Sequence, residues 1–388
     1  MNILFTLTPA FDPNDGGVQR TTWKLGQYFT EQGYNVSYFS FNHEGHVEPE
    51  FGNLFTAKKP DKNKNPQNIE ELRKVLDQIQ PDIVINQMPY EEGLRDTLAE
   101  LKSSQGYKLL GCLRNSLFSF KSNARDKMKQ LLPAPVFKLL DNPVGIGLVQ
   151  LRHKFKHRRD LKAIIDRHDY FILLAPPNRE ELRYFVGDYK KEKVVSIPNS
   201  IPFVHEDLSQ KEKIILHVGR INISQKRSDL LADFWEKLHK QVPGWKFVVV
   251  GDGPYFKTLK SEVEQRNLPR IALEGFQTPE AYYKRASVFM MPSAYEGFPN
   301  TLLEAQSYGC APVLFNSYKA LDWIVEDGKN AKLISPFDTQ LMADEVAALC
   351  NQPDTLKHMQ LSALGNAKRF TIERVGNQWE EFFEEIIK

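Results

Sequence analysis

The 388-residue chain is poor in cysteine and has no long apolar run. Its three cysteines, Cys112, Cys310 and Cys350, lie far apart, which excludes a disulfide framework and the close cysteine pairs of a zinc site. We expect all three to be buried thiols. No stretch of about 18 apolar residues could cross a membrane, and the N-terminus lacks the basic leader of a signal peptide. These absences together predict a cytoplasmic protein.

Charge is nearly balanced overall, with a net charge of +2, but it is unevenly distributed. Residues 108–167 contain 14 Lys or Arg and 4 Asp or Glu, a net charge of +10, interleaved with Phe, Leu and Val. A basic and apolar surface suits an anionic membrane interface. A solvated charged helix would explain the same composition. Nucleic acid is not expected as a partner, because no nucleic-acid-binding module is recognisable.

Short apolar runs alternate with amphipathic stretches along most of the chain, a pattern typical of parallel sheets covered by helices on both faces. The segment SIPNSIPFVHEDLSQKEK interrupts this alternation and reads as a linker. We therefore expect an α/β protein with two doubly wound parallel-sheet domains, at 1–200 and 201–370, followed by a helix at 371–388 that could pack back on the first domain. The expected strands are 3–8, 36–41, 83–88, 109–113, 170–175, 194–197, 214–218, 247–251, 271–274, 288–292, 312–315 and 331–334.

The first candidate motif, TPAFDPNDGGVQR, joins the first expected strand to the first helix. Gly16 and Gly17 allow a ligand to approach the backbone, and the helix N-terminus offers free N–H groups that suit phosphate. The motif is neither a P-loop nor a GxGxxG fingerprint. A plain strand-to-helix turn explains it equally well.

The second motif, ILHVGRINISQKRSDLL, places two basic residues after the first strand of the second domain. Arg220 directly follows Gly219, and Lys226 comes six residues later. Ligands of doubly wound sheets bind at the carboxyl ends of the strands, where Arg and Lys grip phosphate oxygens. Two basic residues at one strand end favour an anion site over a solvated loop. The nearby VVVGDGP is interpreted as a structural turn.

The third motif, AYEGFPNTLLEAQSYG, follows the apolar strand VFMMPS. Thr301 and Glu304 have the spacing of a capping box, which would explain Glu304 by helix initiation alone. A capping box does not require Glu296, nor the Gly-Phe-Pro-Asn loop, in which Gly297 allows an unusual backbone. We therefore predict a helix start that is also one wall of a binding site.

These motifs together resemble the group-1 (family-4) branch of the retaining GT-B glycosyltransferases. The spacing of Glu296 and Glu304 matches the E-x7-E signature of that family, and GGVQR, VGRINISQK, VVVGDGP and SIPNSI match its other motifs in order. The resemblance spans almost the whole chain and is strongest in 214–330. It implies two Rossmann-like domains that face a cleft, with the donor held mainly by the C-terminal domain.

The resemblance implies a donor that is a nucleotide-diphospho-sugar, most commonly a UDP-sugar. Arg220 and Lys226 would hold the diphosphate and Glu296 would lie near the sugar, and these three are the implied catalytic residues. Gly17 would add a backbone N–H from the first domain, Glu304 would bind the ribose, and the segment 275–277 would meet the base. The implied donor-binding residues are Gly16, Gly17, Gly275, Phe276, Gln277, Gly297, Phe298, Pro299, Asn300, Thr301 and Glu304.

On the acceptor side the sequence departs from the family. Where members often carry a histidine after the fourth strand, this chain has Arg114, followed by Asn115. Arg114 could bind an acceptor phosphate or be an ordinary surface arginine. The expected acceptor is a glycan or a lipid-linked molecule in surface polysaccharide or glycoconjugate assembly. The expected enzyme is a hexosyl- or N-acetylhexosaminyl-transferase that lies in the cytoplasm or peripherally on the inner face of the membrane.

No Asp-x-Asp pair occurs in the chain, so the sequence predicts metal-independent transfer without a cofactor, the nucleotide-sugar being a substrate. Two other functions remain open. A UDP-sugar 2-epimerase would share the two-domain architecture but would not explain the E-x7-E loop. A catalytically dead sugar-nucleotide-binding protein would not need Arg220, Lys226, Glu296 and Glu304 together.

Overall fold

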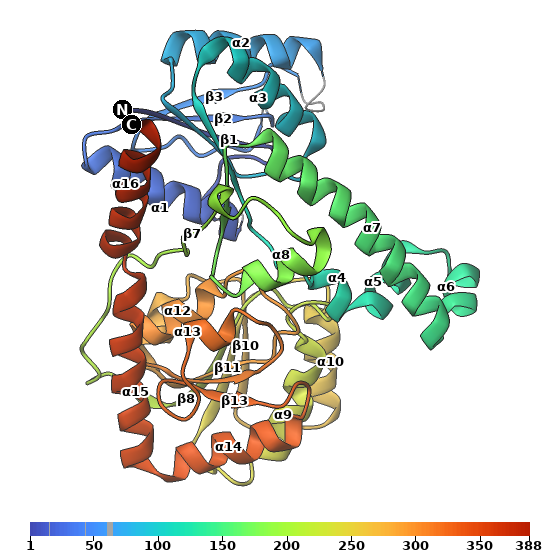
Figure 1. Cartoon of the computed structure of the whole chain (residues 1–388). Helices are drawn as coiled ribbons and strands as arrows, with labels where there is room; N and C mark the ends of the chain where they lie inside the picture. Colours follow the sequence, from blue (N-terminus) through green and yellow to red (C-terminus); the bar gives the residue numbers. More distant parts are fainter. Residues whose placement is uncertain (15, 43, 60–64) are drawn as a thin grey trace. The chain divides into compact units, whose positions relative to one another are not determined.

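The computed structural model describes residues 1–14, 16–42, 44–59 and 65–388 (Figure 1). Its contacts divide the chain into two compact units. Unit 1 comprises residues 1–117, 151–202 and 372–388, and unit 2 comprises residues 118–150 and 203–371. Residues 118–150, expected in the first domain, therefore group with the second unit. The helix α7 (Pro143–Arg167) runs from one unit into the other.

Unit 1 is built on a parallel sheet with the strand order β3-β2-β1-β4-β5-β6-β7. Its strands are short and nearly all buried, because helices cover both faces of the sheet. The strands are β1 (Asn2–Leu7), β2 (Asn35–Ser40), β3 (Asn53–Thr56), β4 (Ile83–Asn86), β5 (Lys108–Cys112), β6 (Tyr170–Leu173) and β7 (Val194–Ser196).

Side chains of β1 alternate between two cores, as the period of two along a strand requires. Ile3 and Phe5 lie in a core with α1 (Gly17–Glu31) and α16 (Ile372–Ile387), whereas Leu4 lies in a second core with α2 (Pro66–Ile79) and α3 (Glu92–Gln105). The remaining helical elements of this unit are α8 (Asn178–Val186) and the 3-10 turn η1 (Lys191–Lys193).

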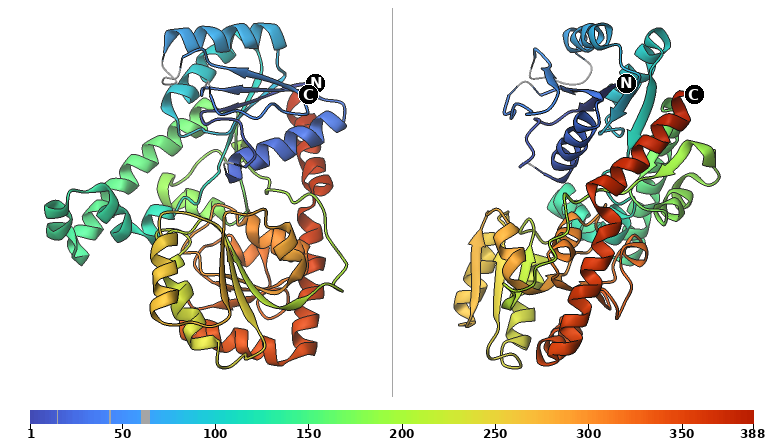
Figure 2. Two further views of the ribbon diagram at one scale, coloured as in Figure 1. Left: turned by 180° about the vertical axis from the view of Figure 1, so that it is seen from behind. Right: turned by 90° about the vertical axis from the view of Figure 1, so that its left-hand side faces the viewer.

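The last helix of the chain, α16, packs against α1, and the two helices lie side by side in both views (Figures 1 and 2). Trp379 and Phe383 are buried on its apolar face, and the Phe383 ring lies 5.3 Å from that of Phe29 on α1. Gly376 permits this approach, because a Cβ there would lie 2.2 Å from the Tyr28 ring. The C-terminal helix thus belongs to the core of unit 1.

Unit 2 contains a second parallel sheet, with the strand order β10-β9-β8-β11-β12-β13. Reversal of the order at β8 and β11 creates a switch point, and ligands of such sheets bind outside the carboxyl ends there. The strands are β8 (Glu212–Val218), β9 (Lys246–Val250), β10 (Ile271–Gly275), β11 (Ala286–Met291), β12 (Ala311–Phe315) and β13 (Lys332–Ile334).

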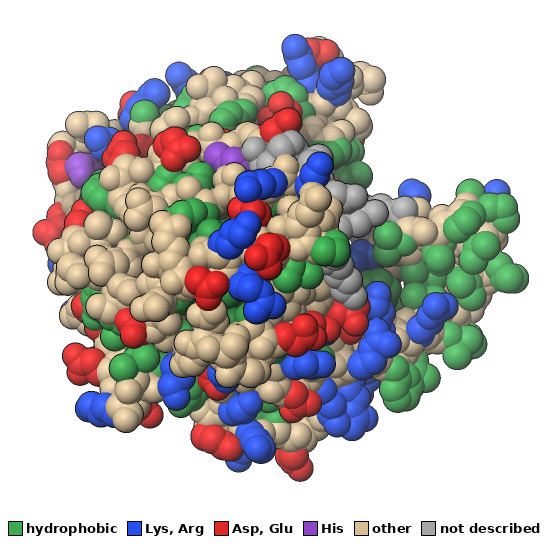
Figure 3. Space-filling view, turned by 90° about the horizontal axis from the view of Figure 1, so that it is seen from above, with side chains coloured by type: hydrophobic (Ala, Val, Ile, Leu, Met, Phe, Trp, Pro, Cys, Tyr) green, Lys and Arg blue, Asp and Glu red, His purple; other side chains and the backbone are tan. Residues whose placement is uncertain are grey.

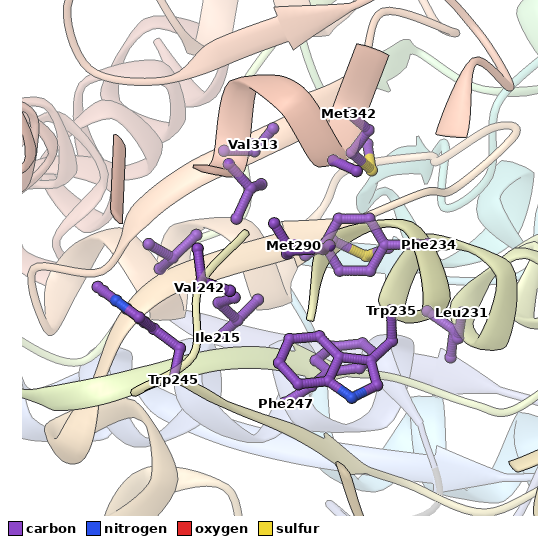
Figure 4. Close-up of a cluster of buried hydrophobic side chains, with 14 of the residues drawn as sticks. Ile215, Leu231, Phe234, Trp235, Val242, Trp245, Phe247, Met290, Val313 and Met342 are labelled. Carbon is purple, nitrogen blue, oxygen red and sulfur yellow. The ribbon is translucent and has the colours of Figure 1, made fainter. Parts of the chain in front are cut away.

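One face of this sheet packs on α9 (Leu231–Leu238) and α14 (Thr339–Asn351), where Phe234, Trp235 and Phe247 fill the centre of the core (Figure 4). Figure 4 also shows Met290 and Met342 among the side chains of this core. The other helical elements of unit 2 are α4 (Ser119–Ser122), α5 (Ala124–Leu131), α6 (Ala134–Leu140), η2 (Ser228–Leu230), α10 (Phe256–Gln265), α11 (Glu280–Arg285), α12 (Asn300–Ser307), α13 (Leu321–Ile324), α15 (Pro353–Ala367) and η3 (Lys368–Phe370).

The α/β architecture with two parallel sheets agrees with the sequence analysis. Both ends of each expected strand lie within two residues of the observed ends. The strand β3 was missed, because its four residues lie at a sheet edge and are half-buried at most. All three cysteines are buried free thiols, as expected. Within the described part of the chain, no helix has the length and apolar character needed to cross a membrane.

Candidate functional site

The carboxyl ends of β8 and β11 bring two of the candidate motifs together in unit 2. The two strands are neighbours in the parallel sheet, so the loops that follow them lie at the same edge. The loops are hydrogen-bonded to each other, since the backbone N–H of Ala294 donates to the carbonyl of Gln225 at 2.7 Å. VGRINISQK and AYEGFPN therefore form one local structure.

Lys226 and Glu296 form an ion pair at this edge, with Nζ and Oε1 2.7 Å apart. The Lys226 side chain is 13% exposed and that of Glu296 is 7% exposed, so both charges are largely removed from water. The other carboxylate oxygen, Oε2, accepts a hydrogen bond from Nε2 of Gln225 at 3.1 Å. A buried carboxylate needs such partners for both oxygens.

Asn222 shapes the loop that carries Lys226. Its side-chain oxygen accepts hydrogen bonds from the backbone N–H groups of Gln225 and Lys226, at 3.1 and 3.0 Å. The lysine stem runs past Gly219, where a Cβ would lie 3.5 Å from Lys226 Cε, at ordinary contact distance. The position of the ammonium group is thus fixed by the loop as well as by Glu296.

The VVVGDGP segment lets neighbouring strand ends approach closely. Gly251 has φ +141°, and a Cβ there would lie 1.9 Å from the carbonyl oxygen of Gly219. Its N–H donates to the carbonyl of Gly275 at 2.7 Å, while the N–H of Gly219 donates to that of Val250 at 3.0 Å. This contact gives the physical reason for interpreting the motif as a structural turn, because only glycine fits where the two loops approach each other.

The predicted capping box is not formed. Helix α12 begins at Asn300 with Pro299 as its N-cap residue, and no side chain caps it. Thr301 already lies inside the helix, where its hydroxyl oxygen is 4.0 Å from the sulfur of Met291. Glu304 instead accepts a hydrogen bond from the Tyr283 hydroxyl at 3.2 Å. Its position is therefore set by tertiary contact rather than by helix initiation.

The loop between the two glutamates is anchored by packing. Gly297 does not have a positive φ, so the expectation of an unusual backbone there is wrong. Phe298 is buried, with its ring centroid 5.9 Å from that of Phe370 and 6.4 Å from that of Trp323. This aromatic cluster holds the Gly-Phe-Pro-Asn segment against the body of unit 2.

Arg220 and the segment 275–277 lie at the same edge of the sheet, and all of them except half-buried Gly275 are exposed. Arg220 is exposed directly after β8 and Gly219. At the end of β10, Gly275 has φ +70°, which favours glycine, and Phe276 after it is 70% exposed. Gln277 is also exposed. An aromatic ring left in water at a strand's carboxyl end is available for stacking.

Three residues of this region escaped the sequence analysis: Gln225, His217 and Tyr318. Burial lowers the pKa of His217 to about 4, against the opposing effect of its hydrogen bond to the Met290 carbonyl, so the imidazole is neutral at pH 7. Burial, together with the charge of Glu296, raises the pKa of Tyr318 well above its ordinary value. Only Gln225 had a sequence signal, as the neighbour of Lys226.

Arg114, in unit 1, is not an ordinary surface arginine. Its Nε donates to Gln87 at 2.6 Å and its Nη1 donates to Asn199 at 3.0 Å, which joins the carboxyl ends of β4, β5 and β7. Its Nη2 is buried and has no hydrogen-bond partner among the described residues. Burial lowers the pKa of the guanidinium, while nearby Cys112 raises it. Asn115 beside it is exposed.

The glycine motif of unit 1 forms a helix start, as expected. Gly16 is the N-cap residue of α1 with φ +147°, and Gly17 is the first helical residue. Gly16 has no side chain that could cap the helix, and among the described residues no side-chain cap is found for the first backbone N–H groups of α1. In the described ranges, no group of three or more His, Cys, Asp and Glu side chains could hold a metal ion.

Two family models match the chain. The model described as "Glycosyl transferases group 1" matches residues 202–363, and the model described as "Glycosyltransferase Family 4" matches residues 15–113. Together they cover more than half of the chain. The first includes every candidate residue of unit 2, and the second includes Gly16 and Gly17 of the glycine motif.

Some similar proteins match almost the whole chain, and others match about half of it. The amylovoran biosynthesis glycosyltransferase AmsD of Erwinia amylovora is 22% identical over 95% of this chain and 96% of its own length. A GalNAc-alpha-(1->4)-GalNAc-alpha-(1->3)-diNAcBac-PP-undecaprenol alpha-1,4-N-acetyl-D-galactosaminyltransferase of Campylobacter jejuni is 22% identical over 46% of this chain and 49% of that protein.

Among solved structures, Anabaena Alr3699/HepE in complex with UDP superposes with a TM-score of 0.74 and 15% identity, covering 99% of this chain and 100% of that one. This likeness concerns the fold. Family models, motif geometry and fold agree, and the chain belongs to the group-1, family-4 glycosyltransferases with the GT-B fold.

Proposed function

We propose that the protein transfers a hexosyl or N-acetylhexosaminyl group from a UDP-sugar to a glycan or lipid-linked acceptor during the assembly of a surface polysaccharide or glycoconjugate. The observation that carries this proposal is the desolvated Lys226–Glu296 pair beside exposed Arg220 at the switch point of the unit 2 sheet. Such a site offers positive charge for a diphosphate and a carboxylate for sugar hydroxyls within one pair of loops.

In this proposal Arg220 and Lys226 bind the diphosphate and stabilise the charge that develops on the departing nucleotide. An ammonium group has three N–H donors. Lys226 can therefore keep its bond to Glu296 and still donate to a phosphate oxygen. Because Asn222 fixes its backbone, little reorganisation is needed when charge develops. This electrostatic role predicts transfer without a divalent metal.

Glu296 is proposed to bind the donor sugar. Each of its oxygens has one protein partner, so each retains a lone pair that can accept a hydroxyl hydrogen. Glu304, oriented by Tyr283, is proposed to accept hydrogen bonds from the ribose hydroxyls. The segment 297–301 would surround the sugar and phosphates, and 275–277 would meet the base, with Phe276 as its exposed aromatic face.

The relatives suggest which class of acceptor the enzyme uses, and unit 1 contains the residues proposed to bind it. One relative is described as an amylovoran biosynthesis enzyme and another as acting on an undecaprenol-linked saccharide, which supports a glycan or lipid-linked acceptor. The buried Nη2 of Arg114 suits an acceptor phosphate, and Asn115 lies next to it. The N-terminus of α1 at Gly16 and Gly17 is proposed instead to donate N–H groups to the diphosphate of the donor. We place the enzyme peripherally on the inner face of the membrane.

The experiment that tests this function is a thermal-shift panel of UDP-, GDP- and ADP-sugars, followed by transfer assays with the stabilising donor. A donor present at 100 times its Kd stabilises by about 2.7 kcal/mol, so the correct one should stand out. Lys226→Ala combined with Glu304→Ala should remove the donor-induced shift, and EDTA should leave transfer unchanged. Analysis of the product's anomeric configuration tests retention.

Three results would overturn the proposal: no nucleotide-sugar stabilises the protein, the double variant transfers as well as wild type, or a UDP-sugar is epimerised without any acceptor. A control variant, Leu361→Ser, alters an exposed residue on α15 and should keep the donor-induced shift. It separates a site effect from a general loss of stability.

A further inference from the structure

Exposed apolar side chains are concentrated in one short part of the chain. Seven large apolar residues between positions 131 and 155 are 41–76% exposed. In Figure 3 green side chains gather over the α5–α7 region at the right of the view, with Lys and Arg beside them. We call the members within unit 2 the apolar crest: Leu131, Val136, Leu139, Val144 and Leu148.

The crest lies on an ordered helical hairpin. Arg125 on α5 holds Asp141, which follows α6, through two hydrogen bonds of 2.6 and 2.8 Å. Gly145 lets the first turn of α7 approach the end of α6, because a Cβ there would lie 2.4 Å from the carbonyl oxygen of Leu140. The crest leucines therefore remain in water although their hairpin is packed.

The exposed stripe continues along α7. Val144, Leu148, Leu151 and Phe155 are spaced by four, three and four residues, the spacing of one helix face. Monomeric proteins rarely expose apolar patches of this kind unless a partner covers them. The crest is therefore a candidate docking surface, and the charge around it indicates which kind of partner it would fit.

That charge is positive. Between residues 127 and 159 the only acidic residue is Asp141, whose charge is paired with Arg125. Exposed lysines, Lys129 and Lys138, flank the crest, and Arg152 and Lys156 lie on the turns of α7 that follow. Basic side chains around an apolar surface complement anionic headgroups and acyl chains. Two copies meeting through this surface would instead bring like charges together.

The same hairpin also reaches the donor loop within unit 2. Lys127 on α5 lies with its Nζ 5.4 Å from the ring centroid of Tyr295, the residue before Glu296. Its ammonium also donates to the hydroxyl of Ser119 at 3.2 Å. A surface bound to the crest would accordingly lie on the element that contacts the candidate site.

We propose that the apolar crest inserts into the interface of an anionic lipid bilayer while its flanking lysines contact the headgroups. This narrows the basic segment 108–167 to its α5–α7 hairpin, because β5 is largely buried and Arg114 is half-buried, whereas the exposed apolar side chains lie on the hairpin. The purpose of docking, access to a lipid-linked acceptor, rests on the proposed function; the binding itself does not.

Vesicle flotation of the full chain tests the inference, with phosphatidylcholine vesicles that contain or lack phosphatidylglycerol. Wild type should float with the anionic vesicles at low salt and not with the neutral ones. Leu139→Ser with Leu148→Ser should lower the partition coefficient about thirtyfold, and Lys129→Gln with Lys138→Gln about tenfold. Leu341→Ser with Leu361→Ser, which changes two exposed leucines elsewhere in unit 2, should bind like wild type.

The inference is overturned if wild type stays with the unbound fraction, or if the crest variant and the Leu341/Leu361 control bind equally. A wild-type dimer that the crest variant converts to a monomer would identify a second copy as the partner instead. Donor-induced thermal shifts are measured in parallel and should be unchanged in the crest variant. Loss of those shifts in wild type would refute the proposed function while leaving the flotation result to decide the crest.

Discussion

The Lys226–Glu296 pair gives a prediction that separates stability from catalysis: a second substitution should restore the first but not the second. Replacing Lys226 with Met removes the charge but keeps much of the apolar stem that lies over Gly219. Glu296 then remains as a buried carboxylate with one hydrogen bond, from Gln225. The loss of an ion-pair partner in a desolvated site is far more destabilising than the net contribution of the pair.

The expected size follows from burial. Breaking a buried pair costs about 3–5 kcal/mol, and the remaining Gln225 bond and the partial exposure of the site place this pair near about 3 kcal/mol. For a unit of this size that corresponds to a drop in Tm of about 6–12 °C. Glu296→Gln should cost about 1 kcal/mol, since the amide still accepts a hydrogen bond.

Calorimetry on Lys226→Met, on Glu296→Gln and on the variant that carries both substitutions completes a double-mutant cycle. The double variant should unfold within about 1 kcal/mol of wild type, because no buried charge is left alone, and the sum of the single losses should exceed it by about 3 kcal/mol. Transfer should not recover: kcat should fall about a hundredfold or more in Lys226→Met and in the double variant. If transfer returned with stability, both residues would be structural and the proposed site would be wrong.

Three further predictions concern residues around the two cores and the site. Gly251→Ala should lower Tm and weaken donor binding, measured by calorimetry and titration, because its Cβ would overlap a backbone carbonyl at 1.9 Å; an unchanged Tm would contradict the loop geometry. Buried His168 and His217 have pKa values of about 4, below the ordinary value, so stability should be complete above about pH 6.5 and fall toward pH 4, by up to about 3 kcal/mol for each. Flat chemical-denaturation midpoints across that range would refute this. Tyr283→Phe should raise KM for the donor several-fold with little change in kcat, because Glu304 loses its hydroxyl partner; steady-state kinetics with unchanged KM would argue against a ribose role.

Much of the fold was predictable because apolar strands and amphipathic helices leave a local signature. The runs VVV in β9 and VFMM in β11 are buried on both faces of the sheet. Such continuous apolar runs indicate a parallel sheet. β3 was missed because its side chains are half-exposed at an edge, where periodicity weakens. The interruption near 196–213 was visible because proline and polar residues break helices and strands.

The site was only partly predictable. Arg220, Lys226 and Glu296 could be placed near strand ends, because each lies in the loop that follows an apolar run. Their pairing could not, since 70 residues separate Lys226 from Glu296 and only the adjacency of β8 and β11 brings them within 2.7 Å. Local spacing even misled at Thr301, whose capping pattern the structure does not use.

The sequence by itself determined the fold class, the family and the residues that carry charge at the strand ends, because these depend on local pattern and motif order. Tertiary structure alone decided which of those residues meet: Lys226 with Glu296, Tyr283 with Glu304, and Arg114 with Gln87 and Asn199. It also decided that Leu131, Leu139 and Leu148 face water. The physical reason is that burial and contact are set by how distant segments pack, which no local pattern contains.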